Sequence, residues 1–310
     1  MGSTEEEPRL VLRGIPIPAS PRTPAVMGVV NASPESFSDG GRYPTVDAQL
    51  RRAMELVDAG AGIIDVGGES GVTGMAPLSA DKEIVRVLPL VRRLHAQGVV
   101  ISVDTWKPPV ARAVLDAGAH LINDVSGLLH RELAEACAAS GAGLVIMHTR
   151  AKPKRKDFPI YHDVVEDVIG FLGERLALAT ELGVAQDGII VDPGPDFAKT
   201  PAQTVRVLRE LDRLHVLARP ILLAVSRKDF IGALTNRTPL QRDAGTLAAI
   251  GDGLDRGAAI LRVHDVAATR NYLRVRAVLR GDDIVDNDLH LPVHLRREPT
   301  SPTANRIPNA

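Results

Sequence analysis

Residues 119–127 read Ala-His-Leu-Ile-Asn-Asp-Val-Ser-Gly, so a short apolar run stops abruptly at polar residues and a glycine. Comparable junctions occur at seven other places along the chain, at Asn31, Asp65 to Glu69, Asp104, His148, Asp192, Ser226 to Lys228 and Arg262 to Asp265. A (β/α)8 barrel assembles its active site from the C-terminal ends of all its strands. The repeated junction therefore predicts a single-domain α/β protein folded as a TIM (β/α)8 barrel.

The sequence between these junctions alternates strand-like and helix-like segments. Apolar runs suited to parallel strands buried on both faces occupy residues 25–30, 62–66, 99–103, 119–122, 142–147, 188–191, 220–225 and 258–263. Helical periodicity follows at residues 46–59, 80–96, 108–117, 132–139, 163–182, 201–214, 240–254 and 266–279. Several helical patterns end in a glycine, a common residue at helix C-termini, at Gly60, Gly98, Gly118, Gly141, Gly183 and Gly257. A doubly wound open sheet is the rival fold, but no Gly-x-Gly-x-x-Gly turn follows the first strand.

The two ends of the chain differ in composition from its middle. Residues 1–23 are rich in proline, which disfavours regular structure, so we predict an N-terminal extension in which residues 10–17 could form a short hairpin. The barrel is expected to span residues 24–281. Residues 282–310 are acidic and then rich in proline, arginine and asparagine, which predicts a flexible C-terminal tail.

Composition excludes several classes of function. The formal net charge is -1 and aromatic residues make up 3% of the 310 residues, which argues against a nucleic-acid partner. No apolar run approaches the roughly 20 residues that a membrane span needs, and the N-terminus is acidic where a secretory signal would be basic. The single cysteine, Cys137, fits a buried structural thiol. We therefore expect a cytoplasmic protein without membrane or nucleic-acid partners.

The strand ends carry the chemistry for a ligand with two faces. A flat heterocycle with ring N–H and amino donors needs carboxylate and amide acceptors, a role that suits Asp104, Asn123 and Asp192. A neighbouring anionic group, such as a phosphate, needs cationic donors, and Arg262, His264 and Lys228 are available. Asn31 could complete a Mg²⁺ shell made mostly of diphosphate oxygens and water.

Each of these residues also has a structural explanation. A polar residue at a strand end often caps the following helix, and Asp124 is such a candidate. Asp192 could belong to a plain turn, and His148 could satisfy a hydrogen bond in the core rather than line a pocket. The basic loop Lys152–Lys156 could be a solvated loop or could attract an anionic substrate. The functional interpretation gains weight because all the strand ends meet at one mouth.

The strand ends, in order, read MGVVNASPESFSDGG, DVGGES, SVDT, INDVSG, MH, DPGPDFAK, SRKDFIG and RVHDV. From about residue 24 to residue 280 this series resembles the dihydropteroate synthase family. The resemblance implies a homodimeric TIM barrel that joins 6-hydroxymethyl-7,8-dihydropterin diphosphate to p-aminobenzoate and releases pyrophosphate, with Mg²⁺ on the diphosphate. It also implies binding of sulfonamides and sulfones, which target this family.

The resemblance carries over residue by residue to roles at the site. It implies pterin contacts from Asp104, Asn123, Asp192 and Lys228, and contacts to diphosphate and magnesium from Asn31, Arg262 and His264. In the loop after the first strand, Phe37 and Asp39 match residues that close over the reacting centre, where Asp39 would stabilise a pterin cation. Ser226 and Phe197 match the p-aminobenzoate side. The expected catalytic residues are Asp39, Lys228 and Phe37.

The chain departs from the family pattern mainly in its second loop. Where the family usually reads Thr-Arg-Pro-Gly, this chain has Gly71-Val72-Thr73-Gly74, so the cation of the loop is absent. Losing one good transition-state contact costs about 10²–10³ in rate. Asp196, Ala198 and Ala224 also replace glycines of the pattern, and Asp196 adds negative charge near an anionic substrate.

These departures predict a preserved pterin site with weak or no condensation, as in the divergent second homologue of mycobacteria and related actinobacteria, which the chain resembles. A fully active synthase is the first alternative, and it would need another cation, from Arg42 or from residues 152–156. A pterin-binding regulatory barrel and a different pterin-dependent transferase are the other two.

Overall fold

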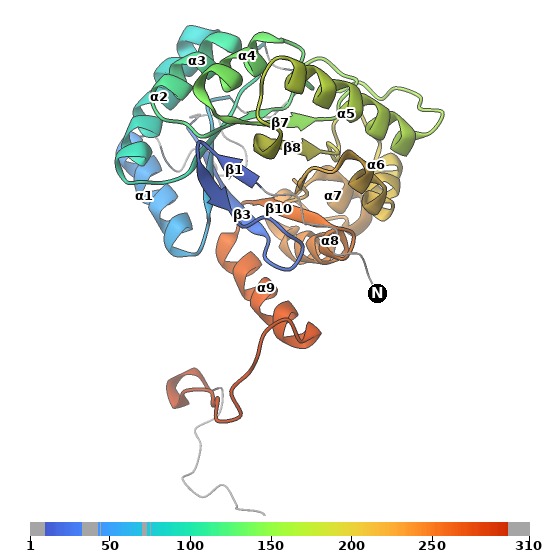
Figure 1. Cartoon of the computed structure of the whole chain (residues 1–310). Coiled ribbons are helices and arrows are strands. Elements are labelled where there is room, and N and C mark those ends of the chain that lie inside the picture. Colours follow the sequence, from blue (N-terminus) through green and yellow to red (C-terminus); the bar gives the residue numbers. More distant parts are fainter. Residues whose placement is uncertain (1–9, 33–42, 44, 70–72, 75, 297–310) are drawn as a thin grey trace, which may run out of the picture. The chain divides into compact units, whose positions relative to one another are not determined.

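The computed structural model describes residues 10–32, 43, 45–69, 73–74 and 76–296, and its centre is a closed barrel (Figure 1). Eight parallel strands form the ring in the order β10-β3-β4-β5-β6-β7-β8-β9. This confirms the predicted TIM barrel. The strands are β3 (Ala25–Asn31), β4 (Ile63–Gly67), β5 (Ile101–Asp104), β6 (Leu121–Asp124), β7 (Gly143–Met147), β8 (Ile189–Asp192), β9 (Ile221–Leu223) and β10 (Ala258–Val263).

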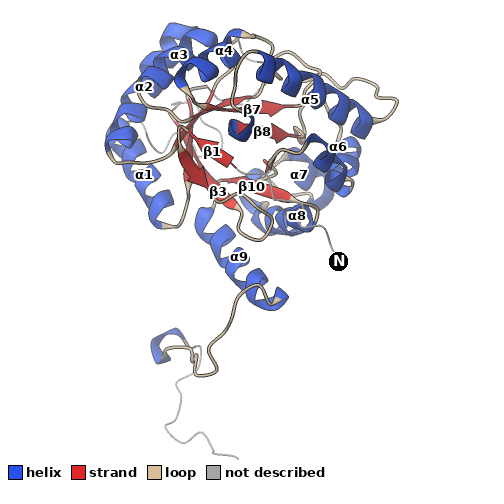
Figure 2. Ribbon diagram, viewed as in Figure 1, coloured by secondary structure: helices blue, strands red, loops and turns tan. Residues whose placement is uncertain are grey.

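Helices surround this ring of strands (Figure 2). They are α1 (Val46–Asp58), α2 (Ala80–Ala96), α3 (Pro108–Asp116), α4 (Glu132–Ser140), α5 (Val164–Glu181), α6 (Pro201–Arg209), α7 (Asp229–Thr235) and α8 (Asp243–Asp255). Helix α9 (Val266–Arg280) follows β10 in the chain. Short 3-10 turns lie at Gln186–Gly188, Leu211–Leu217, Pro239–Gln241 and Val293–Leu295. No helix in the described ranges is long and apolar enough to cross a membrane. By its contacts the chain divides into two units, one ending at Tyr272 and one beginning at Leu273.

Local sequence signals set the ends of these helices. The side chains of Thr45, Ser79 and Asp163 accept hydrogen bonds from the first turns of α1, α2 and α5, as N-cap residues do. Thr200 and Gln203 form a capping box at the start of α6. All six glycines predicted to end helices have positive φ angles, as expected for residues at or just beyond a C-cap.

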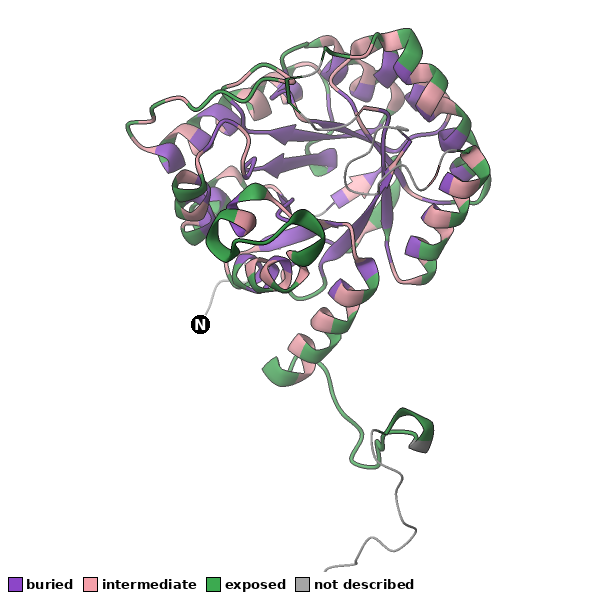
Figure 3. Cartoon of the chain, turned by 180° about the vertical axis from the view of Figure 1, so that it is seen from behind, coloured by how far each residue is buried: buried purple, intermediate pink, exposed green. Residues whose placement is uncertain are grey.

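The strands are buried on both faces while the helices expose one side (Figure 3). The register brings the polar strand ends level with one another: Asp104 pairs with Asn123 on one side and with Gly67 on the other, and Met147 pairs with Asp192. Because neighbouring strands are only ≈ 4.8 Å apart, this register gathers side chains that lie far apart in the sequence.

The hairpin considered for residues 10–17 is present, and it belongs to the barrel core. β1 (Leu10–Leu12) pairs with β2 (Ile15–Ile17) in antiparallel register. Leu10 and Leu12 are fully buried in one apolar cluster with residues from the strands, Met27 among them. Arg13 donates to the carbonyl oxygens of Leu115 and Ala119 at 3.1 and 3.0 Å. The hairpin is therefore packed into the barrel, and is more than an appended extension.

Two helical segments differ from the sequence-based expectation. Helix α7 was not anticipated, because its seven residues are too few to show an amphipathic repeat. The helix expected over residues 201–214 ends at Arg209 and is followed by a 3-10 turn, Leu211–Leu217. The strands at 99–103 and 220–225 are also shorter than their apolar runs, since apolar periodicity does not mark strand ends.

Candidate active site

Arg262, at the end of β10, holds two carboxylates together at the mouth of the barrel. Its Nε donates to Asp65 Oδ2 at 2.7 Å and its Nη2 to Asp104 Oδ2 at 3.1 Å. Asp65 also accepts from Ser102 Oγ at 2.6 Å and from Asn123 Nδ2 at 3.2 Å. Four strands thus contribute to one polar cluster, buried at Asp65, Ser102 and Asn123 and partly exposed at Asp104 and Arg262. We call these five residues the floor cluster.

Asp65 was not predicted as a site residue, although it has the most contacts in the floor cluster. Its sequence setting contained the signal: it is the single charge within the buried strand Ile-Ile-Asp-Val-Gly. A buried charge in such a run needs a partner. The partner itself, Arg262, lies 197 positions further along the chain, so no local pattern could have identified it.

Asn123, at the end of β6, has an unused hydrogen-bond acceptor. Its side chain is 2% exposed, and Nδ2 is taken by Asp65. Its Oδ1 is buried and has no hydrogen-bond partner in the described part of the chain. Buried polar atoms are almost always paired, so an orphan carbonyl oxygen at this position fits a ligand that donates a hydrogen bond.

Asp104 faces two opposing influences. Burial raises its pKa to about 7, Arg262 acts in the opposite direction, and the nearby charges of Asp65 and Glu83 raise it further. Two carboxylates share one guanidinium here, so the second negative charge is poorly compensated. A ligand that donates to Asp104 would favour its ionised form.

Asp192, at the end of β8, is a buried carboxylate in a tight turn. Its Oδ1 accepts from the backbone N–H of Gly194 at 2.7 Å, and burial raises its pKa, with Lys228 and Lys199 opposing. Gly194 has φ +64°, and a Cβ there would lie 2.1 Å from the carbonyl oxygen of His148. The sequence left open a turn or a site residue for Asp192, and the geometry accommodates both.

Lys228 and Phe197 lie together beside Asp192. Lys228 Nζ lies 4.2 Å from the centre of the Phe197 ring, within cation–π distance. Burial lowers the pKa of Lys228, while Asp196 and Asp192 raise it. The amino group predicted for the pterin side and the aromatic ring predicted for the p-aminobenzoate side are therefore neighbours.

Ser226 and His264 form a second pair of predicted residues in contact. His264 Nδ1 lies 2.9 Å from Ser226 Oγ. Burial, assisted by Arg262 and Arg227, lowers the pKa of His264 to about 3. The imidazole is therefore neutral at pH 7 and can offer one N–H to an anion, and in this state it is not a cation.

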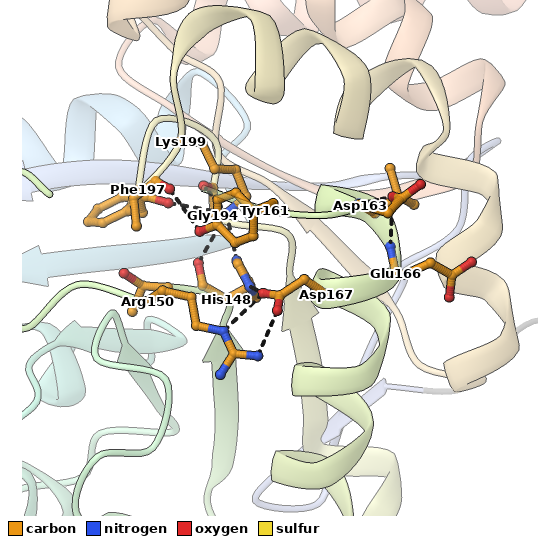
Figure 4. A network of polar contacts seen from close by, with 12 residues as sticks. His148, Arg150, Tyr161, Asp163, Glu166, Asp167, Gly194, Phe197 and Lys199 are labelled. Carbon is orange, nitrogen blue, oxygen red and sulfur yellow. Dashed lines mark hydrogen bonds and ion pairs between the residues drawn. The ribbon is translucent and has the colours of Figure 1, made fainter. Parts of the chain in front are cut away.

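A buried network links the loop after β8 to the loop after β7 (Figure 4). Lys199, 1% exposed, donates to His148 Nδ1 at 2.7 Å and to the carbonyl oxygens of Gly194 and Phe197 at 3.0 and 3.2 Å. His148 Nε2 lies 2.8 Å from Asp167 Oδ1. His148 thus takes the core role that the sequence left open, and Lys199 fixes the loop that carries Phe197.

Burial shifts the pKa values of both basic groups in this network. It lowers the pKa of Lys199 to about 7 and that of His148 to about 3. Sequence reasoning missed Lys199, because a lysine in a loop after a strand is normally expected in solvent.

Asp124 is structural, but it does not cap the following helix as its position suggested, because the N-cap of α4 is Arg131. Its carboxylate accepts from Ser126 N, Ser126 Oγ and Leu128 N at 2.8, 2.6 and 2.6 Å. These bonds fold the loop after β6 back on itself. Cys137 is buried, as expected, and burial raises its pKa, so its thiol stays protonated at neutral pH.

Two departures from the family pattern occupy glycine-like backbone positions. Asp196 and Ala198 have φ angles of +64° and +52°, a region that costs other residues roughly 1–2 kcal/mol. Asp196 is held by its own contacts: Oδ2 accepts from Phe230 N at 3.2 Å and Oδ1 accepts from Thr204 Oγ1 at 3.3 Å. Its carboxylate therefore caps the start of α7.

Three cations of the basic loop 152–156 make ion pairs, namely Lys154, Arg155 and Lys156. Lys154 Nζ lies 3.3 Å from Glu69 Oε1, with both side chains 8% exposed, and Lys156 Nζ lies 3.1 Å from Asp229 Oδ2. Lys107 also pairs with Glu69, at 2.6 Å. Arg227 is likewise paired, with Asp243 at 2.8 Å.

Asn31 ends β3 opposite Gly67 of β4. A Cβ at Gly67 would lie 3.5 Å from Asn31 Oδ1, so the glycine leaves room beside this oxygen. Among the described residues no group of three His, Cys, Asp or Glu side chains could hold a metal ion. Phe37, Asp39, Arg42, Gly71 and Val72 lie outside the described residues.

Comparison with known proteins identifies the family. Residues 27–264 match the pterin binding enzyme family. The dihydropteroate synthase of Bacillus subtilis is 43% identical over 243 residues, which are 78% of this chain and 83% of that protein. Two solved synthase structures are similar. That of Xanthomonas albilineans with 4-aminobenzoic acid has a TM-score of 0.81 at 42% identity and covers 88% and 98% of the two chains. The structure of the Yersinia pestis synthase with a sulfonamide drug complex has a TM-score of 0.83 at 36% sequence identity. This match covers 89% of the present chain and 100% of the Yersinia chain. The chain therefore belongs to the dihydropteroate synthase family.

Proposed function

We propose that this protein condenses 6-hydroxymethyl-7,8-dihydropterin diphosphate with p-aminobenzoate to give dihydropteroate and pyrophosphate. The observation that carries the proposal is the floor cluster with the orphan Oδ1 of Asn123, because it offers a buried set of acceptors with one acceptor still unused. The 43% identity to a dihydropteroate synthase supports it.

The proposed pterin site uses the strand ends on one side of the mouth. The amino and ring N–H groups of the pterin would donate to Asp104, Asp192 and Asn123 Oδ1, and Lys228 would donate to an acceptor of the ring. The low dielectric of this buried position strengthens each of these bonds. Burial disfavours ionisation of Asp104 and Asp192, and pterin donors would offset that effect.

The proposed diphosphate and p-aminobenzoate sites flank the pterin. Asn31, Arg262 and the neutral His264 would contact the diphosphate, and Asn31 would contribute to a shell for Mg²⁺, which supplies charge neutralisation of the leaving group when bound. Phe197 and Ser226 would contact p-aminobenzoate. Sulfonamides and sulfones would compete at the p-aminobenzoate position.

The reaction is proposed to be a dissociative substitution at the pterin methylene carbon. The carbon–oxygen bond to the diphosphate breaks, and its electron pair leaves with pyrophosphate. The amino nitrogen of p-aminobenzoate supplies the pair for the new carbon–nitrogen bond and then loses a proton. The protein contributes electrostatic stabilisation and exclusion of water. Phe37, Asp39 and Lys228 are the proposed catalytic residues, on the resemblance of their motifs.

A second candidate function is pterin binding with weak or absent turnover, in a divergent homologue. The sequence Gly71-Val72 favours it, because the usual cation of that loop is missing. Asp196 also supports it, since its charge lies close enough to Lys228 to affect the pKa of that lysine. A regulatory role in which pterin binds without chemistry belongs to the same candidate. Another pterin-dependent transferase has no comparable observation in its favour.

One experiment separates the two candidates. Purified protein would be incubated with Mg²⁺, the pterin diphosphate and p-aminobenzoate, and the formation of dihydropteroate would be followed while each ligand is also titrated alone. Turnover comparable to the Bacillus subtilis enzyme assayed in parallel would support the condensation. Binding without turnover would support the second candidate, and absence of pterin binding would contradict both.

A paired substitution tests the second loop directly. Changing Gly71→Thr together with Val72→Arg restores a cation, so a chain limited by that loop should gain about 10²–10³ in rate. Gly71→Thr alone is the matched control, because it adds bulk without charge. A double variant no faster than this control would locate the limitation elsewhere. We also propose that the active form is a homodimer, which sedimentation velocity would test.

A further inference from the structure

A basic hollow lies outside the floor cluster, between the loops that follow β6 and β7 and the helix α5. Its volume is about 210 Å³. Gly127, Leu129 and Phe171 contribute to its apolar wall, and Arg150, Lys152 and Arg175 contribute charge. None of the residues lining it belongs to the floor cluster or to the proposed p-aminobenzoate side. The proposed condensation assigns no role to Arg150, Phe171 or Arg175.

The charge of this hollow is unbalanced. Neither Arg175 nor Lys152 makes an ion pair with a described residue, and no acidic residue lines the hollow. Arg175 Nε is buried and has no hydrogen-bond partner within the described ranges. A buried guanidinium nitrogen without an acceptor costs free energy, and a bound anion would remove that cost.

Phe171 keeps the two arginines at this place. The guanidinium carbon of Arg150 lies 4.9 Å from the centre of the Phe171 ring and that of Arg175 lies 5.1 Å from it. Arg150 is also held by Asp167, through bonds of 2.9 and 2.8 Å, which Figure 4 shows beside His148. Asp167 contributes the largest rise in the pKa of Arg150. The cations are therefore positioned before any ligand arrives.

Hydroxyl groups at the rim are already occupied. Ser126 Oγ donates to Asp124 Oδ1 at 2.6 Å, and Thr149 Oγ1 donates to the carbonyl oxygen of Ala151 at 3.3 Å. Among the side chains that line the hollow, the donors that remain for a ligand are those of the three cations. Guanidinium and ammonium donors select anions, and above all phosphates, which match the guanidinium fork.

We propose that this hollow is a second anion site, which binds a diphosphate group. Its volume is below the ~300–1,000 Å³ of pockets for drug-sized ligands, so the bound group is small. Two cations without carboxylate partners, with Arg150 beside them, favour more than one negative charge. Free inorganic diphosphate and the diphosphate of a nucleotide share this chemistry.

The test measures diphosphate binding by calorimetry, with pterin and Mg²⁺ absent. The full-length protein would be compared with the double variant Arg175→Gln, Lys152→Gln, and with Arg131→Gln, a control that removes an exposed arginine from the start of α4. Loss of charged hydrogen bonds predicts at least a tenfold weaker affinity for the double variant. The control should bind as the wild type does.

Separate arms distinguish this site from the proposed active site and identify the source of the anion. His264→Gln removes a proposed diphosphate contact at the barrel mouth, so it should leave the binding event at the hollow intact. Inorganic phosphate, diphosphate and a nucleoside diphosphate would be titrated in turn. Equal affinity for the last two shows that only the diphosphate group is recognised, and tighter nucleotide binding shows that the nucleoside contributes.

Two outcomes would overturn the proposal. One is unchanged diphosphate affinity in the double variant, and the other is absence of diphosphate binding in a wild-type protein that binds pterin. Thermal unfolding would check that each variant is folded. If the double variant is not, Lys152→Gln alone serves, because that lysine is exposed on a loop, and it should still weaken diphosphate binding severalfold.

Discussion

Asp65 and Asp104 share the guanidinium of Arg262, so one cation pairs with two carboxylates at the mouth of the barrel. Burial raises the pKa of Asp104 to about 7; Arg262 lowers this pKa and the negative charge of Asp65 raises it. The proposed pterin ligand would donate hydrogen bonds to Asp104 and so stabilise the ionised form of its carboxylate.

Pterin affinity should rise with pH up to about 7 and then level off. The pKa of Asp104 is raised to about 7 by burial, so below that value its carboxyl is protonated and must lose a proton when it accepts from the ligand. Calorimetry with the hydroxymethyl-dihydropterin lacking its diphosphate, in buffers of different ionisation enthalpy, would measure the proton release.

Two variants act as controls for this pH dependence. Asp104→Asn should bind the pterin weakly, and its affinity should not change with pH, because the titrating group is gone. Lys199→Met should keep the dependence of pterin affinity on pH, although the pKa of Lys199 is also about 7. An affinity of the wild type that stays constant between pH 5.5 and pH 8, a window chosen to bracket the midpoint by roughly one unit, would contradict the prediction.

Asp65→Asn should move the pH midpoint of the rise in pterin affinity to a lower value. The negative charge of Asp65 raises the pKa of Asp104, and its removal leaves Arg262 with one carboxylate. The variant should also lose about 3 kcal/mol of unfolding free energy, at the low end for a broken buried ion pair. Urea unfolding and the calorimetric pH series measure the two effects. Ser102→Ala removes a neutral donor to Asp65, so a similar midpoint shift in that variant would count against the charge argument.

At the scale of elements, the β1–β2 hairpin joins the core of the barrel. Leu12 is fully buried, and a Cβ at Gly143 of β7 would lie 2.4 Å from its Cδ2, so the two elements are in close contact. In contrast, Ile15 in β2 is 39% exposed. The sequence allowed a short hairpin here, and the tertiary structure added that this hairpin packs into the core.

Leu12→Ala should therefore destabilise the protein by about 2–5 kcal/mol, the range for large-to-small changes in a core. Ile15→Ala is the matched control in the same hairpin and should change stability by about 0.5 kcal/mol or less. Urea unfolding midpoints, with the slope of the transition as a check on compactness, measure both. Equal effects of the two variants would show that the hairpin is not part of the cooperative core.

For the molecule as a whole, the two ends of the chain differ in how deeply their residues are buried. The described residues from Arg280 to Arg296, Val293 aside, are exposed, whereas residues 10 and 12 are buried. Removing residues 282–310 should leave the unfolding midpoint unchanged, while removing residues 1–17 should lower it or prevent folding. Circular dichroism during urea unfolding measures both. A lower midpoint after loss of the C-terminal segment would contradict the prediction.

The sequence alone determined the barrel and most of the residues at its mouth. Apolar runs that stop at polar residues are a local signal, and helix caps and glycines are read within a few residues, so eight strand–helix units could be counted without tertiary information. Asn123, Asp104 and Asp192 were found in this way, because a barrel brings all strand ends to one face.

Only the tertiary structure decided which of these groups are partners. Arg262 donates to Asp65, which lies 197 positions earlier in the chain, and Lys199 contacts His148, which lies 51 positions earlier. The N-terminal hairpin packs into the barrel. Each contact depends on closure of the ring, and residues far apart in sequence leave no mark of it in local periodicity. The stretch around Asn123 illustrates this division. Its sequence pattern predicted the end of a strand, whereas the fold paired Asn123 Nδ2 with Asp65 and left Asn123 Oδ1 without a partner among the described residues.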